Sequence, residues 1–206
     1  MIVLTGDTRS YRAIEQLKKH GWGRLIVQQM ITLYENEPWG FDNGAYVDFT
    51  HGRQFDDVRF NKMLHKVYTL GIPYLAVAPD IVAGGLQSLE FSLDYMRWVL
   101  PHDWPWYLAV QDGMTIDDIK PYIDKFSGVF LGGSDAFKWT AKEWCDFAHD
   151  NGKKFHFARV NPKRLIRAKE LGADSVDGTG LLWEQQKFNR FVKTYYCEDE
   201  QLKLFG

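Results

Sequence analysis

The stretch KFHFARVNPKRLIRAKELGADSVD, residues 154–177, decides the predicted fold. It begins with an apolar run over 154–160, which predicts a buried strand. Asn161 and Pro162 then supply a capping side chain and a proline at the first helical position, and the predicted helix stops at Leu171 and Gly172. A second short segment, over 173–176, begins and ends on the apolar residues Ala173 and Val176. The stretch therefore predicts strand, helix and strand, the repeating unit of a parallel sheet.

Similar short apolar runs recur along the whole chain. They cover 2–4, 25–27, 40–42, 74–78, 106–110, 128–131, 154–160 and 173–176. Strands that are apolar throughout and alternate with helices predict a parallel sheet covered by helices, and eight such units predict a closed (β/α)8 barrel. The second unit is shortened, because the residues between Gln28 and Phe41 contain Pro38 and no clear helix. An open doubly wound sheet is the competing architecture.

Helix start and stop signals support this division. Thr115 and Thr140 each stand three residues before a carboxylate, the spacing of a capping box. Gly21 and Gly71 end two earlier predicted helices. We therefore expect helices to fill most of the segments between the strands.

The composition predicts one soluble domain. The chain has 206 residues, 45% of them hydrophobic, and a formal net charge of −2. We expect the barrel to span 1–196 and a tail to span 197–206. No apolar run approaches the roughly 18 residues of a membrane helix, and the first residues lack the pattern of a signal peptide, so we expect a cytoplasmic protein. Its two cysteines, Cys145 and Cys197, match no metal-ligand spacing, and we predict neither a metal nor a cofactor.

Positive charge gathers in the C-terminal part. Residues 151–206 carry a net charge of +4, and residues 1–150 carry −6. A basic end permits a polyanionic partner, although a solvated helix face gives the same pattern. The residues that could contact a nucleic-acid backbone are Arg159, Lys163, Arg164 and Arg167.

Carboxylates, amides and glycines follow the predicted strands. Because the carboxyl ends of parallel strands meet at one rim, these residues should converge. They include Asp7, Asp42, Asp80, Gln111, Gly132, Gly133 and Asp177. Any one of them could be an ordinary turn residue. Several unpaired carboxylates at one mouth would destabilise the fold, which favours a functional role for the group.

These motifs resemble, in order, those of the tRNA-guanine transglycosylase superfamily. FDNGAY at 41–46 resembles its "Asp-Ser-Gly-Gly-Phe" motif, APD at 78–80 its base-reading strand end, VQDG at 110–113 its "Val-Gln-Gly", and LGGS at 131–134 its "Gly-Gly-Leu". The stretch 155–177 resembles the segment that ends in the nucleophilic aspartate. The zinc module of the family has no counterpart here. The small size is closer to the branch that inserts 7-deazaguanines into DNA.

The resemblance implies a role for each matched residue. Asp177 would attack C1′ to form a covalent glycosyl-enzyme, and Asp42 would move the proton of the base. The base would be bound by Asp80, Gln111 and the backbone at Gly132 and Gly133. It would be stacked on an aromatic ring, either Tyr46, Phe41 or Trp183.

Three functions remain open at this point. The first is base exchange in nucleic acid, DNA favoured over RNA, with a free nucleobase as co-substrate. The second is a hydrolytic DNA glycosylase that leaves an abasic site. The third is a barrel that only binds nucleic acid, and three aspartates could also hold magnesium. A protein partner or a homodimer is left open as well.

Overall fold

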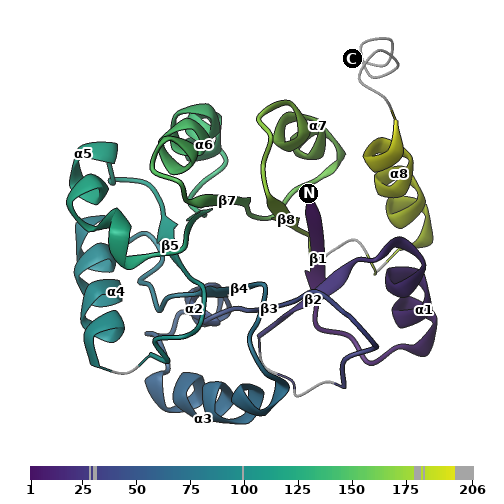
Figure 1. Ribbon diagram of the computed structural model, residues 1–206, viewed down its shortest axis with the longest axis horizontal. Helices are drawn as coiled ribbons and strands as arrows, with labels where there is room; N and C mark the ends of the chain where they lie inside the picture. The colour runs from purple at the N-terminus through teal and green to yellow at the C-terminus, as the bar shows by residue number, and fades with distance from the viewer. Residues whose placement is uncertain (28, 30–31, 99, 179–181, 183, 198–206) are drawn as a thin grey trace.

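The computed structural model describes residues 1–27, 29, 32–98, 100–178, 182 and 184–197. Eight parallel strands form a closed barrel in the order of the sequence, with β8 paired to β1 (Figure 1). The strands are β1 Ile2–Gly6, β2 Gly23–Ile26, β3 Trp39–Phe41, β4 Leu75–Val77, β5 Trp106–Val110, β6 Gly128–Leu131, β7 Lys154–Phe157 and β8 Ser175–Asp177. The predicted (β/α)8 barrel is confirmed, and the open sheet is excluded.

Helices surround this ring (Figure 1). They are α1 Tyr11–His20, α2 Ala45–Thr50, α3 Asp57–Val67, α4 Leu86–Trp98, α5 Ile116–Ile119, α6 Ala141–Asp150, α7 Pro162–Glu170 and α8 Gln185–Tyr196, with 3-10 turns at Tyr68–Leu70, Lys120–Lys125 and Phe137–Thr140. Within the described residues, none of these helices has the length and apolar character needed to cross a membrane.

Two of the three predicted helix N-caps are present. Thr115 forms a capping box with Asp118, and Asn161 accepts a bond from the Arg164 N–H. The capping prediction for Thr140 was wrong. Its hydroxyl donates to the Phe137 carbonyl at 2.7 Å, because a 3-10 turn precedes α6 and offers that carbonyl first.

Apolar side chains from the strands fill the inside of the barrel. The buried residues of this inner cluster are Leu4, Leu25, Leu75, Val77, Tyr107 and Ala109. A Cβ on Gly40 would lie 2.8 Å from Leu25 Cδ1 and 3.0 Å from Leu4 Cδ1, so glycine leaves room for both leucines. A larger core lies between the strands and the helices. Phe41 is fully buried there, so the prediction that it might stack on a substrate was wrong.

A buried ion pair fills the place of a helix in the shortened second unit. Arg24 lies on β2, and its guanidinium bonds to both carboxylate oxygens of Glu37 at 2.6 Å. It also donates to the carbonyls of Thr8 and Thr32, and Glu37 accepts the Tyr34 N–H. These bonds connect the segments after β1 and β2 to the entry of β3. Among the described residues between β2 and β3, no helix is present, as predicted.

Replacing Arg24 with methionine should lower the free energy of unfolding by about 3–5 kcal/mol, because Glu37 would stay buried without its partner. Urea denaturation measures this loss. The matched control is Lys142→Met, which breaks the exposed Lys142–Asp146 pair and should change stability by less than about 1 kcal/mol. If Arg24→Met were as mild as this control, the ion pair would not stabilise the second unit.

Candidate active site

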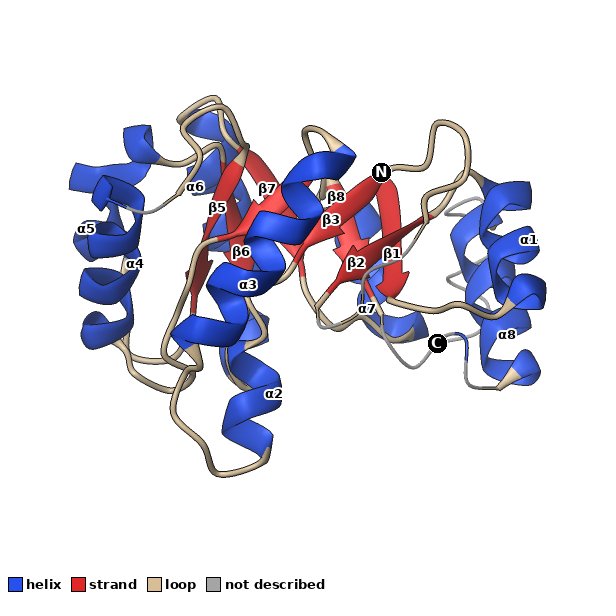
Figure 2. Ribbon diagram, turned by 90° about the horizontal axis from the view of Figure 1, so that it is seen from below, coloured by secondary structure: helices blue, strands red, loops and turns tan. Residues whose placement is uncertain are grey.

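The predicted site residues lie at the end of the barrel where the strands finish. In Figure 2 the helix α2 projects from the barrel on this side, beyond the ends of β1 and β5. Asp42 and Asn43 lie between β3 and α2, Asp80 follows β4, Gln111 follows β5 and Asp177 ends β8. The negative charges of Asp177, Asp80 and Asp7 all raise the pKa of Asp42, so the carboxylates converge as expected.

Asp177 is held at one oxygen by two nitrogen atoms. His156 Nε2 lies 3.0 Å from its Oδ1, and the Arg159 backbone N–H donates to the same oxygen at 2.9 Å. The residue is only 3% exposed. No residue in the described part of the chain donates to Oδ2. One oxygen of this carboxylate is therefore fixed and the other is left open.

Asp42 is a buried carboxyl group with a raised pKa. Burial of its carboxyl group raises its pKa to about 7, opposed by the Gly44 N–H, which donates to Oδ1 at 2.7 Å, and supported by the neighbouring carboxylates. A carboxyl group with this pKa carries its proton in part of the molecules at neutral pH. Asp42 can therefore act as an acid where Asp177 is positioned as a base or nucleophile.

Asp80 is bound to the strand end next to it. Asn43 Nδ2 donates to Asp80 Oδ1 at 2.8 Å and to the Ala78 carbonyl at 2.7 Å. Burial raises the pKa of Asp80 to about 6, against the bond from Asn43. Asn43 was not singled out as a site residue from the sequence, although it lies inside the FDNGAY motif. It fixes the carboxyl group that the resemblance assigns to base reading.

Gln111 holds the loop between β4 and α4. Its Nε2 donates to the Ile81 carbonyl at 2.9 Å and to Ser88 Oγ at 2.8 Å, and its Oε1 accepts the Ala83 N–H at 2.5 Å. The residue is 3% exposed. All its polar groups are thus engaged within the protein, and a direct contact to a base would require these bonds to break.

Arg159 crosses the mouth and covers Tyr46. Its guanidinium carbon lies 4.5 Å from the centre of the Tyr46 ring, and Nη2 donates to the Gly133 carbonyl. Arg159 has a φ of 54°, which is uncommon for a residue with a side chain. The Arg159 side chain thus contacts Tyr46 and Gly133 and forms no ion pair with Asp177 or Asp80. Tyr46 is 48% exposed, with this guanidinium over its ring.

The predicted backbone donors at Gly132 and Gly133 differ in their surroundings. The Gly132 N–H already donates to the carbonyls of Val110 and Phe130, so it offers nothing to a ligand. Gly133 has a φ of 71°, and a Cβ there would lie 2.7 Å from Phe137 and 2.8 Å from Asp112. Glycine is therefore required at 133, and its role as a backbone donor to the base stays a prediction.

The basic residues after β7 are mostly engaged with other side chains. Arg164 pairs with Asp135 at 2.6 Å and donates to the Arg159 carbonyl, and Arg167 pairs with Glu170 at 3.5 Å. Lys163 is exposed. A phosphate contact from this helix remains a prediction.

Lys138 was missed by the sequence analysis. Its Nζ donates to the carbonyls of Leu131 and Ala158, each at 2.9 Å, where β6 and β7 end. Its pKa is lowered to about 7, mainly by burial and also by the charge of Arg159, while the charge of Asp177 opposes the shift. The residue is only 4% exposed, although it lies in a polar stretch that reads as a surface turn.

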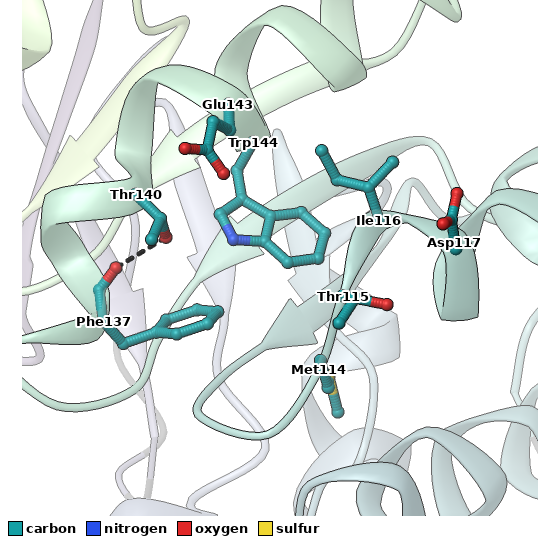
Figure 3. A pocket seen from close by; sticks show the side chains of 8 residues that line it. All are labelled: Met114, Thr115, Ile116, Asp117, Phe137, Thr140, Glu143 and Trp144. Atoms are coloured by element: carbon teal, nitrogen blue, oxygen red, sulfur yellow. Dashed lines mark hydrogen bonds between the residues drawn. The ribbon is translucent and has the colours of Figure 1, made fainter.

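A cavity of about 500 Å³ has one of the site carboxylates, Asp80, on its wall. It is lined by Asp80 together with Ala45, Phe49, Arg53, Gln54, Phe55, Ile81, Val82, Gln87 and Phe91. A second cavity of about 250 Å³ lies near α5 and α6, with Trp144 and Phe137 on its wall (Figure 3). None of the predicted site residues lines the second cavity. The first cavity is therefore the one that belongs to the site.

Two further predictions concern parts of the chain outside this description. Trp183 and residues 179–181 are outside the described residues, as is the tail 198–206. Within the described residues, no cluster of three or more possible metal-ligating side chains is present, so the magnesium alternative gains no support there.

Solved structures share this fold. They include the native KDPGal structure, at 12% identity over 94% of this chain and 92% of that chain with a TM-score of 0.53. RipC from Yersinia pestis matches at 12% identity over 98% and 96%, with a TM-score of 0.53. A 3-hexulose-6-phosphate synthase matches at 8% identity over 94% and 97%, with a TM-score of 0.52. At these identities the likeness shows a (β/α)8 barrel and leaves the chemistry open.

No family model matches the chain. No curated protein matches its sequence either. The function must therefore be argued from the site.

Proposed function

We propose that this protein is an enzyme that cleaves an N-glycosidic bond in nucleic acid and exchanges the base, with Asp177 as the nucleophile. DNA is the favoured substrate. The leaving group is a base of the guanine or 7-deazaguanine type, and a free base of the same type is the second substrate.

One observation carries this proposal: two carboxyl groups at one mouth have opposite environments. Asp177 Oδ1 lies within hydrogen-bonding distance of His156 Nε2 and accepts the Arg159 backbone N–H, which orients this carboxyl group. Asp42 lies at the same mouth and has a pKa of about 7. Glycosidic cleavage needs two carboxyl groups in different roles, since one attacks the sugar and the other protonates the leaving group.

The first step forms one bond and breaks one. Asp177 Oδ2 attacks C1′, the C1′–N bond breaks, and its electron pair moves to the base nitrogen. Asp42 gives its proton to the leaving base. The products are a glycosyl ester on Asp177 and a neutral free base.

The second step reverses these changes with a new base. Asp42, now charged, accepts the proton of the incoming base while the base nitrogen attacks C1′ and displaces Asp177. Water in place of the incoming base would give an abasic site, which is the hydrolytic alternative. Both routes use the same two carboxyl groups.

The cavity beside Asp80 supports a planar leaving group. Asp80 lines it together with aromatic residues such as Phe49 and Phe55, a combination that suits a heterocycle with hydrogen-bonding edges. A base within a duplex cannot reach such a pocket, so the substrate has to be single-stranded or flipped. Phosphate contacts would come from Arg159, Lys163, Arg164 and Arg167.

The test uses the intact chain with single-stranded DNA and RNA oligonucleotides and labelled guanine or 7-deazaguanine. We expect label to enter the oligonucleotide and the displaced base to appear, measured by mass spectrometry. Base release without added base, followed by alkali-sensitive strand breaks, would identify hydrolysis instead. If both measurements were negative while the oligonucleotide still bound in a salt-sensitive manner, the barrel would be a binding protein and the proposal would be wrong.

A further inference from the structure

His156 and Ser175 lie inside the barrel, directly beneath the mouth. His156 on β7 is paired with Ser175 on β8, and Asp177 lies two residues further along the same strand. Residues two apart on a strand point to the same side, so Ser175 and Asp177 share a face. His156 and Ser175 are both 0% exposed.

Hydrogen bonds connect these three side chains into a chain. His156 Nδ1 lies 2.8 Å from Ser175 Oγ, and Nε2 lies 3.0 Å from Asp177 Oδ1. A charged carboxylate only accepts, so Nε2 must carry a proton. In the neutral ring Nδ1 then accepts from the Ser175 hydroxyl.

The ring is also fixed by packing. Phe130 stacks on the imidazole with the ring centres 4.6 Å apart and the planes 7° from parallel. The stacked ring and the two hydrogen bonds leave His156 one orientation, in which Nε2 points at Asp177.

The order of this chain is the reverse of that in a serine hydrolase. There the serine faces the substrate and the aspartate is buried behind the histidine. Here Ser175 is the fully buried end, and Asp177 is the member at the mouth. Ser175 therefore cannot act as the nucleophile. The carboxylate of Asp177 is the member of this hydrogen-bonded series that faces the substrate.

We propose that His156, fixed by Ser175, is a positioning residue that sets which oxygen of Asp177 attacks the sugar. This inference rests on the proposed function. The His156 Nε2–H and the Arg159 N–H both occupy Oδ1, so Oδ2 is presented toward C1′. Without the bond from His156 the carboxylate can rotate, and the attacking oxygen leaves its place.

Two substitutions separate positioning from filling of space. His156→Gln can place an amide N–H near the position of Nε2, while His156→Asn can place one only near Nδ1. We expect His156→Gln to keep at least about a tenth of the wild-type kcat and His156→Asn to lose about 100-fold, with KM unchanged within about threefold, because a misplacement of about 1 Å costs this much.

The control is a second histidine–aspartate pair. His149 on α6 has its Nε2 3.1 Å from Oδ2 of Asp174, the residue that precedes β8. His149→Asn removes a bond of similar length far from the mouth and should leave kcat within about twofold of wild type. A similar loss in His149→Asn and His156→Asn would show a general effect on the fold and would overturn the proposal.

A measurement without substrate tests the bond itself. Nitrogen-15 chemical shifts of the histidine rings report which nitrogen carries the proton, and we expect a proton on Nε2 of His156. A neutral ring protonated on Nδ1 would overturn the proposal, even if His156→Asn failed to fold. If the wild-type protein processed no oligonucleotide but Nε2 were protonated, the proposed function would fail while the bond to Asp177 stood.

Discussion

The Asp177→Asn protein should lose at least about 10⁴-fold in base exchange and form no covalent adduct with the oligonucleotide. The carboxamide can keep an oxygen acceptor for the His156 and Arg159 N–H groups, so the fold of β8 should be retained. What it lacks is the negative charge that attacks C1′. Intact-mass measurement of enzyme quenched with oligonucleotide should detect the adduct in wild type alone.

Two companion variants make this result specific. Asp177→Asn places asparagine before Gly178, a sequence that deamidates readily and restores aspartate, so Asp177→Ala should be made as well. Asp174→Asn changes another aspartate of the same segment, which accepts the Phe155 N–H and faces away from the mouth. It should keep turnover within about threefold of wild type. Base exchange by Asp177→Ala at the wild-type rate would remove Asp177 from the mechanism.

The fold could be predicted because its signals are local and repeated. Each strand is a short apolar run, and caps such as Thr115 and Asn161 mark the helix starts without reference to distant residues. The rim residues followed from the fold, because any residue after a parallel strand is placed at the same end. Asp42, Asp80 and Asp177 therefore came together as expected.

Contacts between distant segments could not be predicted in the same way. Arg24 meets Glu37 inside the fold, and nothing in either segment shows that the pair replaces a helix. The sequence around Lys138 is typical of a surface turn. Only the folded structure brings the two carbonyls at the ends of β6 and β7 to its ammonium group.

His156 shows how strand register hides a function. As a histidine in an apolar strand it reads as an ordinary core residue, and it is indeed fully buried. Only the pairing of β7 with β8 brings its two nitrogens to Ser175 and Asp177. Register depends on both strands together, so the contact could not be predicted from either stretch alone.

The Asp42→Asn protein should be nearly inactive yet more stable than wild type above neutral pH. General acid catalysis contributes about 10²–10⁴-fold, so we expect a loss of about 10³-fold in base release. The asparagine oxygen can still accept the Gly44 N–H, which keeps the turn before α2. The stability gain arises because the substitution removes a charge that burial and three neighbouring carboxylates disfavour.

The sign of the pH dependence follows from the pKa of Asp42. The pKa is about 7 in the folded protein and has an ordinary value of 3.8. The folded state therefore holds this proton more tightly than the unfolded chain. The contribution of protonated Asp42 to the free energy of unfolding is fully present below about pH 4 and is lost as the pH rises through 7. Asp42→Asn does not undergo this loss.

Thermal melts of both proteins between pH 4 and pH 9 measure the difference. The shift from 3.8 to about 7 would correspond to about 4 kcal/mol for a fully shielded group, and solvent at the mouth reduces this to about 1–2 kcal/mol. The expected gain in Tm is about 2–8 °C at pH 9, declining toward zero near pH 4.

Lys138 also titrates near neutral pH, but in the opposite sense. Its pKa is lowered to about 7 from an ordinary 10.5, so its contribution to the free energy of unfolding increases as the pH rises from about 7 to 10.5. Lys138 is present in both proteins, and the difference between their melting curves therefore isolates Asp42. A constant difference across this pH range would show that Asp42 is already charged at low pH and cannot supply the proton for base release. A difference that grows through pH 7, together with the loss of turnover, would assign that proton to Asp42.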